Sequence, residues 1–191
     1  MIARENVVVA AACALLASCG GGGGGGTSEG HVCDGAITTP PALGTDYAPN
    51  FVATWNGTLT VNINGSVNSA PVTLPITRTD VNELGLAGLC DEPKAVPALV
   101  KSSSSFDTVC YVCPPAAITG CSSMVITYQT GSATLSAGTL DLTGTGTAAG
   151  CGMNFQLTFE FVSGLAVRAL ARDGNARAGT ISDILVGALS R

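Results

Sequence analysis

Cysteine is the residue type with the greatest chemical potential in this 191-residue sequence, which contains eight. Cys110-Tyr111-Val112-Cys113 has the CxxC spacing of redox pairs and of zinc ligands. A redox pair lies at the N-terminus of a helix, whose dipole lowers the thiol pKa, but this segment reads as the end of a strand before Pro114-Pro115. Zinc would need two further ligands at comparable spacing. Structural disulfides are therefore favoured over a metal site or a redox pair.

The even set of six body cysteines predicts three disulfides in an exported domain. The set comprises Cys33, Cys90, Cys110, Cys113, Cys121 and Cys151. The sequence does not determine the pairing. Cys113–Cys121 is the bridge we expect first, because it would close the predicted loop of residues 114–120. Closing so short a loop would stabilise the fold by about 2–3 kcal/mol.

Residues for acid–base or nucleophilic catalysis are sparse. His31 is the only histidine, and a catalytic base must be held within hydrogen-bond reach of its partner. The acids are scattered over predicted polar faces and turns: Asp80, Glu83, Asp91, Glu92, Asp107, Asp141 and Glu160. Two of them could converge as a glycosidase pair, but no spacing brings them together. We therefore expect no enzymatic activity and no cofactor.

An N-terminal segment predicts export and anchoring. The apolar run of residues 7–16 follows Arg4 and is too short to span a bilayer, which suits a signal peptide. Its end, Leu16-Ala17-Ser18-Cys19, resembles a bacterial lipobox. This resemblance implies that residues 1–18 are removed and that Cys19 carries acyl chains such as palmitate. A membrane-attached lipoprotein of the cell envelope, at the periplasmic or surface face of the outer membrane, is the expected product.

Residues 19–50 are predicted to connect the anchor to a folded body. Seven glycines, Gly20 to Gly26, form a flexible tether of roughly 15 Å. A phosphate-binding loop would need a preceding strand and a following Lys-Ser/Thr, whereas Thr27-Ser28-Glu29 follows here. The rest of this region is an extended lead-in, which we expect Cys33 to pin.

The body, residues 51–179, is predicted to be all-β. Period-two alternation is clearest over residues 51–64 and 155–161, and Asn64-Gly65 is a hairpin signal. Further short strands are expected at residues 72–76, 84–90, 95–101, 106–113, 124–130, 133–135, 139–147 and 165–170. Turns are expected between them, one at Gly131-Ser132. An antiparallel up-and-down barrel is favoured, with a β-sandwich as the alternative.

Trp55 suggests a more specific likeness. The strand entry Ala53-Thr54-Trp55 resembles the G-x-W entry strand of lipocalin-like barrels, with Ala53 in place of the glycine. The resemblance implies that the indole of Trp55 closes one end of the barrel beneath Arg168. It also implies a wall-packing helix, and residues 180–191 carry a fitting apolar stripe at Ile181, Ile184, Leu185, Ala188 and Leu189.

Two functions remain open for this anchored body. One is a non-enzymatic module that holds a small apolar ligand in the barrel mouth, an expectation that rests on fold likeness. The other is a structural or protein-interaction lipoprotein whose barrel is filled, since Trp55, Phe155, Phe159 and Phe161 could occupy the interior. A net charge of −5 without a basic stripe argues against nucleic acid as a partner.

Overall fold

The computed structural model describes residues 29–90, 95–118 and 120–164. The predicted lipid site Cys19, the strand expected at residues 165–170, Arg168 and the helix expected at residues 180–191 lie outside these ranges. The elements are β1 His31–Val32, η1 Ala48–Asn50 (a 3₁₀ helix), β2 Ala53–Ile63, β3 Ser66–Asp80, β4 Glu83–Leu86, β5 Val96–Ser102, β6 Ser105–Thr108, β7 Tyr111–Val112, β8 Ala116–Ile118, β9 Cys121–Ser136, β10 Thr139–Gly150 and β11 Met153–Ser163.

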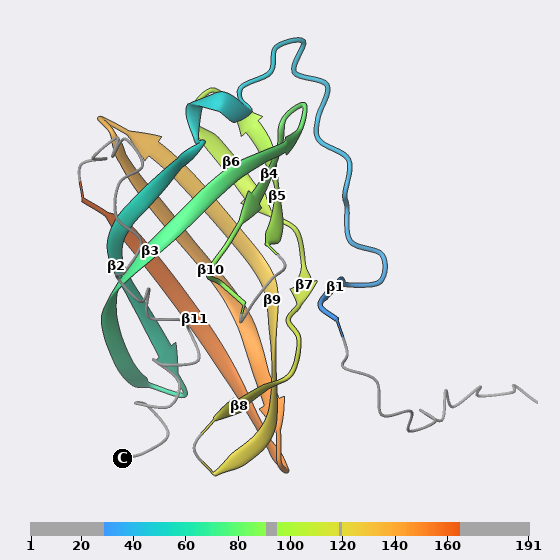
Figure 1. Ribbon diagram of the computed structural model, residues 1–191, viewed down its shortest axis with the longest axis vertical. Coiled ribbons are helices and arrows are strands. Elements are labelled where there is room, and N and C mark those ends of the chain that lie inside the picture. Colours follow the sequence, from blue (N-terminus) through green and yellow to red (C-terminus); the bar gives the residue numbers. More distant parts are fainter. Residues whose placement is uncertain (1–28, 91–94, 119, 165–191) are drawn as a thin grey trace, which may run out of the picture.

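The strands form one antiparallel sheet in which eight strands close into a ring (Figure 1). Around the ring the order is β2, β3, β4, β5, β6, β9, β10 and β11, and β11 pairs with β2 again. Strands β1, β7 and β8 extend the sheet along β9 below its contact with β6. The all-β, antiparallel prediction is therefore confirmed, and the strands form one ring-shaped sheet instead of two packed sheets.

The segments with the clearest alternating patterns form long strands of the ring. In β2 the apolar residues from Trp55 to Ile63 are buried and the residues between them are more exposed. The β2–β3 turn uses Asn64 and Gly65, both at positive φ, as the Asn-Gly signal predicts. A second two-residue turn at Ala137-Gly138, also at positive φ, joins β9 to β10. Period two and turn chemistry were sufficient to locate these hairpins.

The expected turn at Gly131-Ser132 is wrong. Strand β9 runs through both residues, and Gly131 pairs with Gly144 of β10 and with Thr108 of β6. A Cβ on Gly131 would approach Thr108 Oγ1 to 2.5 Å, so this glycine allows close approach of β6 instead of chain reversal. The single strand expected at residues 106–113 is also wrong, because the chain forms two strands there, β6 and β7, separated by Val109 and Cys110. Strand β6 pairs with β5 and β9, whereas β7 pairs with β1 and with a different part of β9.

Strand β3 pairs with two neighbours over different parts of its length, and the two parts meet at Ile76. It pairs with β2 over residues 66–76 and with β4 over residues 76–80. Pro71 and Pro75 both lie in the part that pairs with β2. On the side away from β2, the Pro75 carbonyl accepts a hydrogen bond from the Ala87 N–H. Since proline has no N–H to donate, both residues fit a strand edge, as the sequence predicts for Pro75.

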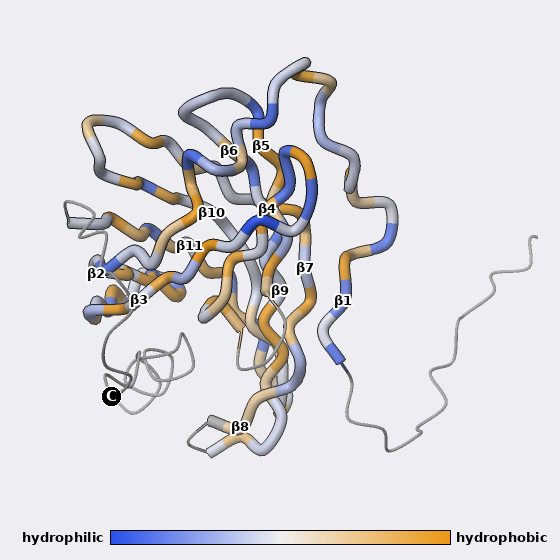
Figure 2. Tube along the Cα trace, turned by 45° about the horizontal axis from the view of Figure 1, so that its top comes forward, coloured by the Kyte–Doolittle hydropathy of each residue, from blue (hydrophilic) through white to orange (hydrophobic). Residues whose placement is uncertain are grey.

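The inner face of the ring is apolar and buried. Hydropathy alternates along the strands (Figure 2), and side chains of Leu84, Leu86, Val96 and Val100 are fully buried on β4 and β5. Next to η1, the aromatic side chain of Phe51 packs edge-on against that of Phe106, with 5.2 Å between the two centroids. After β4, Leu89 and Cys90 are buried, and Tyr128 of β9 donates a hydrogen bond to the Leu89 carbonyl. All of these side chains belong to one continuous hydrophobic core.

Candidate functional site

The six body cysteines form three disulfides, as predicted, but not the expected first pair. The bridges are Cys33–Cys110, Cys90–Cys113 and Cys121–Cys151, with Cα–Cα distances of 5.4, 5.5 and 5.7 Å. The expected Cys113–Cys121 bridge is wrong. Strand β8 folds the intervening loop back on β9, and the pairing of β9 with β10 places Cys121 beside the β10–β11 turn that contains Cys151.

The CxxC segment is divided between two bridges. Cys110 holds β1 and the lead-in through Cys33, while the buried Cys113 holds the segment after β4 through Cys90. The two thiols of the motif are therefore not paired with each other. In the described ranges no three side chains among His, Cys, Asp and Glu are grouped to hold a metal ion. His31 lies exposed on β1, with Nδ1 3.4 Å from the Glu29 carbonyl oxygen.

Trp55 lies near the start of β2, the first long strand, and its side chain is part of the buried core. Its side chain is 3% exposed, and its Nε1 donates a hydrogen bond of 3.0 Å to the Phe51 carbonyl. This bond satisfies the indole N–H inside the core. The partner expected from the resemblance, Arg168, lies outside the described residues. Trp55 is accordingly a residue of the core, and its role in closing one end of the barrel beneath Arg168 stays a prediction.

Large side chains of β11 occupy the interior of the ring. The inner positions Leu157, Phe159 and Phe161 are at most 3% exposed. Glycines on the neighbouring strands make room for them: a Cβ on Gly144 would collide with the Phe159 ring, and one on Gly57 would lie 2.8 Å from the Phe161 ring. The glycine-lined cavity that would favour a ligand is therefore occupied by phenylalanine over this part of the ring.

The outer face of the long strands is lined with hydroxyl groups. We call the following eight residues of β2, β9, β10 and β11 the hydroxyl face: Thr58, Thr60, Thr130, Ser132, Thr134, Thr143, Thr145 and Thr158. They stand in cross-strand register, for example Thr158 opposite Thr145 and Thr145 opposite Thr130. Thr130 and Thr145 share a hydrogen bond of 2.8 Å between their hydroxyl oxygens. This face offers donors and acceptors in rows, with few large apolar groups.

Two shallow grooves and three acidic side chains mark the hydroxyl face. The grooves, of about 630 and 420 Å³, share Thr143 and Gly144. Glu160 lies between Thr60 and Thr143 in the cross-strand register, and Asp141 lies one row away. Asp107 makes an exposed ion pair with Lys101 at 3.4 Å, whereas no ion pair among the described residues involves Glu160 or Asp141. The face is therefore acidic and open to solvent.

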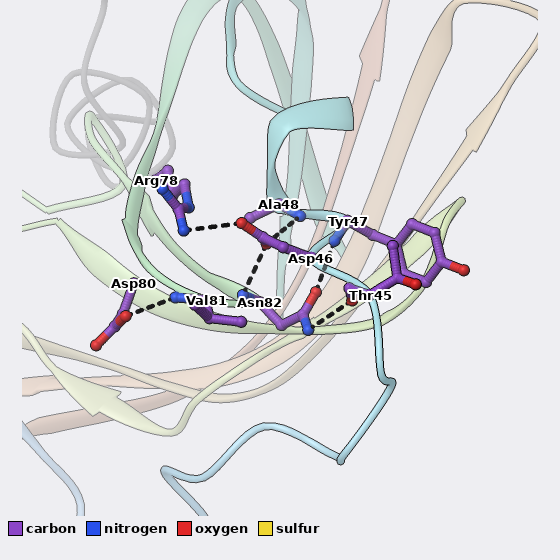
Figure 3. Close-up of polar contacts among 8 residues, drawn as sticks. All are labelled: Thr45, Asp46, Tyr47, Ala48, Arg78, Asp80, Val81 and Asn82. Carbon is purple, nitrogen blue, oxygen red and sulfur yellow. Dashed lines mark hydrogen bonds and ion pairs between the residues drawn. The ribbon is translucent and has the colours of Figure 1, made fainter.

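A polar node fixes the lead-in to the turn between β3 and β4 (Figure 3). The Asp46 carboxylate accepts hydrogen bonds from the N–H groups of Ala48 (3.1 Å) and Asn82 (3.0 Å). It also forms an ion pair with the Arg78 guanidinium (2.8 Å). The Asn82 side chain accepts from Tyr47 N–H and donates to the Thr45 carbonyl.

Hydrogen bonding sets the protonation of this node. The bond from the Asn82 N–H, with smaller contributions from Ala48 and Arg78, lowers the pKa of the Asp46 carboxyl below its ordinary value of 3.8, although burial opposes the shift. The arrangement holds the lead-in and η1 against the turn between β3 and β4.

Sequence reasoning did not find the hydroxyl face or the Asp46 node. The alternate threonines of β10, from Thr143 to Thr147, are visible in the sequence, but only the register of three neighbouring strands makes them a surface. The Asp46–Asn82 contact joins residues 36 positions apart and has no local signal.

Known proteins give no assignment. Comparisons with protein-family models, curated proteins and solved structures find no match to this chain. Within the described ranges, no helix has the length and apolarity needed to cross a bilayer.

Proposed function

We propose that this chain is a lipid-anchored protein of the bacterial cell envelope whose body is a filled, lipocalin-like up-and-down barrel. In this proposal Cys19 carries the acyl chains and the body works as a non-enzymatic protein-interaction module. The support for anchoring is the Leu16-Ala17-Ser18-Cys19 motif. Three disulfides fit the oxidising compartment that an exported protein enters.

The observation that carries the choice between the two functions is the filled interior. A binding site for a small molecule is a concave space of about 300–1,000 Å³ lined mainly by apolar side chains. The interior here contains Phe159 and Phe161 against glycines, and Phe51, Phe106 and Tyr128 belong to the same buried core. The two grooves on the hydroxyl face are shallow and lined mostly by polar residues. Recognition through the outer face follows more directly than capture of an apolar ligand.

Charge indicates the kind of partner. Glu160 and Asp141, which make no ion pair among the described residues, give the hydroxyl face a negative potential, which disfavours anionic lipid and nucleic acid. A protein surface that presents Lys or Arg together with hydrogen-bond donors is complementary to it. We propose such a protein as the partner.

Photocrosslinking in cells tests this function. A photoreactive residue in place of Thr145 should give one discrete protein adduct, and Glu160→Lys should reduce its yield at least tenfold. Asp34→Lys, the same charge reversal at an exposed position of the lead-in, is the matched control and should leave the adduct unchanged. Equal loss with both variants, or no adduct, would contradict the proposal.

A titration of the purified body with a fluorescent fatty acid separates the alternative. We expect no saturable binding. Saturable one-to-one binding that quenches Trp55 would restore the small apolar ligand as the function.

A further inference from the structure

The smaller groove of the hydroxyl face, of about 420 Å³, contains one carboxylate. The described residues that line it are Thr60, Asn62, Val67, Thr143, Gly144, Thr158, Phe159 and Glu160. Glu160 is the only charged residue among them, and its side chain is exposed. No ion pair among the described residues involves Glu160. The groove therefore presents one uncompensated negative charge.

The larger groove differs from the smaller one in this respect. Asp107 is the only acid among the described residues that line it, and its Oδ2 already lies 3.4 Å from Lys101 Nζ. A basic side chain of the same chain thus occupies the position that a basic group of a partner would take. The smaller groove is the one whose carboxylate is available to a partner.

Two neighbouring rows of outward-facing residues form the walls of the smaller groove. In one row Glu160 lies between Thr143 of β10 and Thr60 of β2. In the next row Asn62 of β2 pairs with Val67 of β3. Cross-strand neighbours have Cα atoms about 4.5–5.5 Å apart, and the two rows lie about 6.7 Å apart because they are two residues apart along each strand. A group bound at Glu160 is therefore close to a hydroxyl group on either side.

Hydrogen bonds within the sheet hold polar side chains of these walls in place. The hydroxyl oxygens of Thr60 and Ser69 share a hydrogen bond of 2.8 Å. Asn62 Oδ1 accepts a hydrogen bond of 2.8 Å from the Gly65 N–H. Since a hydroxyl oxygen has two lone pairs, Thr60 keeps at least one acceptor position free in either direction of its bond. Together with the Glu160 carboxylate, this gives the groove several acceptors within a small region.

We propose that the smaller groove is a subsite for an arginine side chain of the protein partner, an inference that rests on the proposed function. A guanidinium group has five N–H donors in one plane and binds a carboxylate through two parallel hydrogen bonds, whereas an ammonium group has three donors around a point charge. Bound to Glu160, the guanidinium has N–H groups left for the hydroxyl oxygens of Thr60 and Thr143. Its aliphatic stem would lie toward Val67, whose side chain is 61% exposed at the β3 end of the groove. Arginine therefore fits the groove better than lysine.

A titration with two short peptides tests this inference. One is a blocked tripeptide with arginine between two glycines, and the other has lysine in the same position. Nuclear magnetic resonance follows the amides of the protein as purified from cells, in a zwitterionic detergent. The arginine peptide should shift the amides of residues 60, 62, 67, 143 and 160 and bind at least fivefold more tightly than the lysine peptide. Because both peptides carry the same charge, general attraction to an acidic face cancels in this ratio. Equal binding, or shifts only elsewhere, would overturn the inference.

Two substitutions separate contact in the groove from the potential of the whole face. Glu160→Gln removes the charge and keeps the shape of the side chain, so it should weaken binding of the arginine peptide at least tenfold. Asp141→Asn removes one charge from the same face outside the groove and should weaken binding less than twofold. Trp55 fluorescence should be the same in both variants, which shows that the body stays folded. Equal effects of the two substitutions would overturn the inference.

Photocrosslinking at Thr145 keeps this inference distinct from the proposed function. A discrete protein adduct together with equal binding of the two peptides would overturn the arginine subsite and leave the protein-interaction function standing. Selective binding of the arginine peptide without an adduct would support the subsite and contradict that function.

Discussion

The Cys33–Cys110 bridge should be the largest single contributor to stability that can be removed without disturbing the core. It closes a loop with a sequence separation of 77, and both cysteines are partly exposed. Chain entropy predicts that such a loop stabilises the fold by about 4.5 kcal/mol. The Cys90–Cys113 bridge gives a shorter covalent path between Cys33 and Cys110, of about 60 residues. This lowers the expected stabilisation by only about 0.2 kcal/mol.

The double variant Cys33→Ser/Cys110→Ser should therefore lose about 4 kcal/mol of unfolding free energy, and its Tm should fall by about 10–15 °C. Urea unfolding followed by Trp55 fluorescence gives the free energy, and calorimetry gives the Tm. The loss should be local in the native state. The Cys33 N–H, bonded to the Cys110 carbonyl, should lose protection from exchange, while the Asn82 N–H at the Asp46 node keeps it.

Two results would refute this reasoning. A loss below about 1.5 kcal/mol would mean that closing the long loop does not restrict the unfolded chain as the entropy model requires. Loss of protection at Asn82 together with Cys33 would mean that the bridge and the node unfold as one unit. Removing Cys121–Cys151, with a separation of 30, is the comparison for loop length, but Cys121 is buried and its replacement adds a packing cost.

Three further predictions follow from the same structure. Gly144→Ala should destabilise the body by about 1–3 kcal/mol because the new Cβ would clash with the Thr130 carbonyl and overpack the Phe159 ring. Gly164→Ala, with its nearest neighbour at 3.9 Å, should have little effect in the same urea titration. The pKa of Asp46 is lowered in the folded state, so its contribution to stability is present above about pH 4 and is lost as the pH falls through the folded pKa. The wild type should therefore have a higher urea midpoint at about pH 6 than at about pH 3, and Asp46→Asn should make this difference smaller. An unchanged difference would contradict the prediction. Cys19→Ala should move the protein from the detergent phase to the aqueous phase or leave an unprocessed precursor, and unchanged partitioning would exclude lipidation at that residue.

Local patterns in the sequence were sufficient for the elements but not for their closure. Residues 53–63 and 153–163 follow a two-residue period, and Asn64-Gly65 and Ala137-Gly138 adopt the positive φ that two-residue hairpins need. Gly131-Ser132 has the composition of a turn, but the close approach of Thr108 explains the glycine, and that contact involves a strand more than 20 residues away.

Disulfide pairing was beyond the reach of sequence spacing for a similar reason. A bridge requires two Cα atoms within about 4.4–6.8 Å, whatever their separation along the chain. Cys90 meets Cys113 because the segment after β4 crosses the interior toward β7. Cys121 meets Cys151 because the β9–β10 hairpin places the start of β9 beside the end of β10, with Val125 opposite Ala149. The first contact depends on the order of strands around the ring, and the second depends on β9 continuing through Gly131-Ser132, where the sequence suggests a turn.

The phase of the glycines was the available signal that the ring is filled. Gly57 and Gly144 fall on the inner positions of their strands, in the same alternation as Leu59 and Leu142. An inner glycine can mean empty space for a ligand or space for a large neighbour. Because Phe159 pairs directly with Gly144, the second meaning applies, and the register turns an ambiguous composition into a packing argument. This packing supports the proposed recognition through the outer surface, where the register aligns hydroxyl groups in rows.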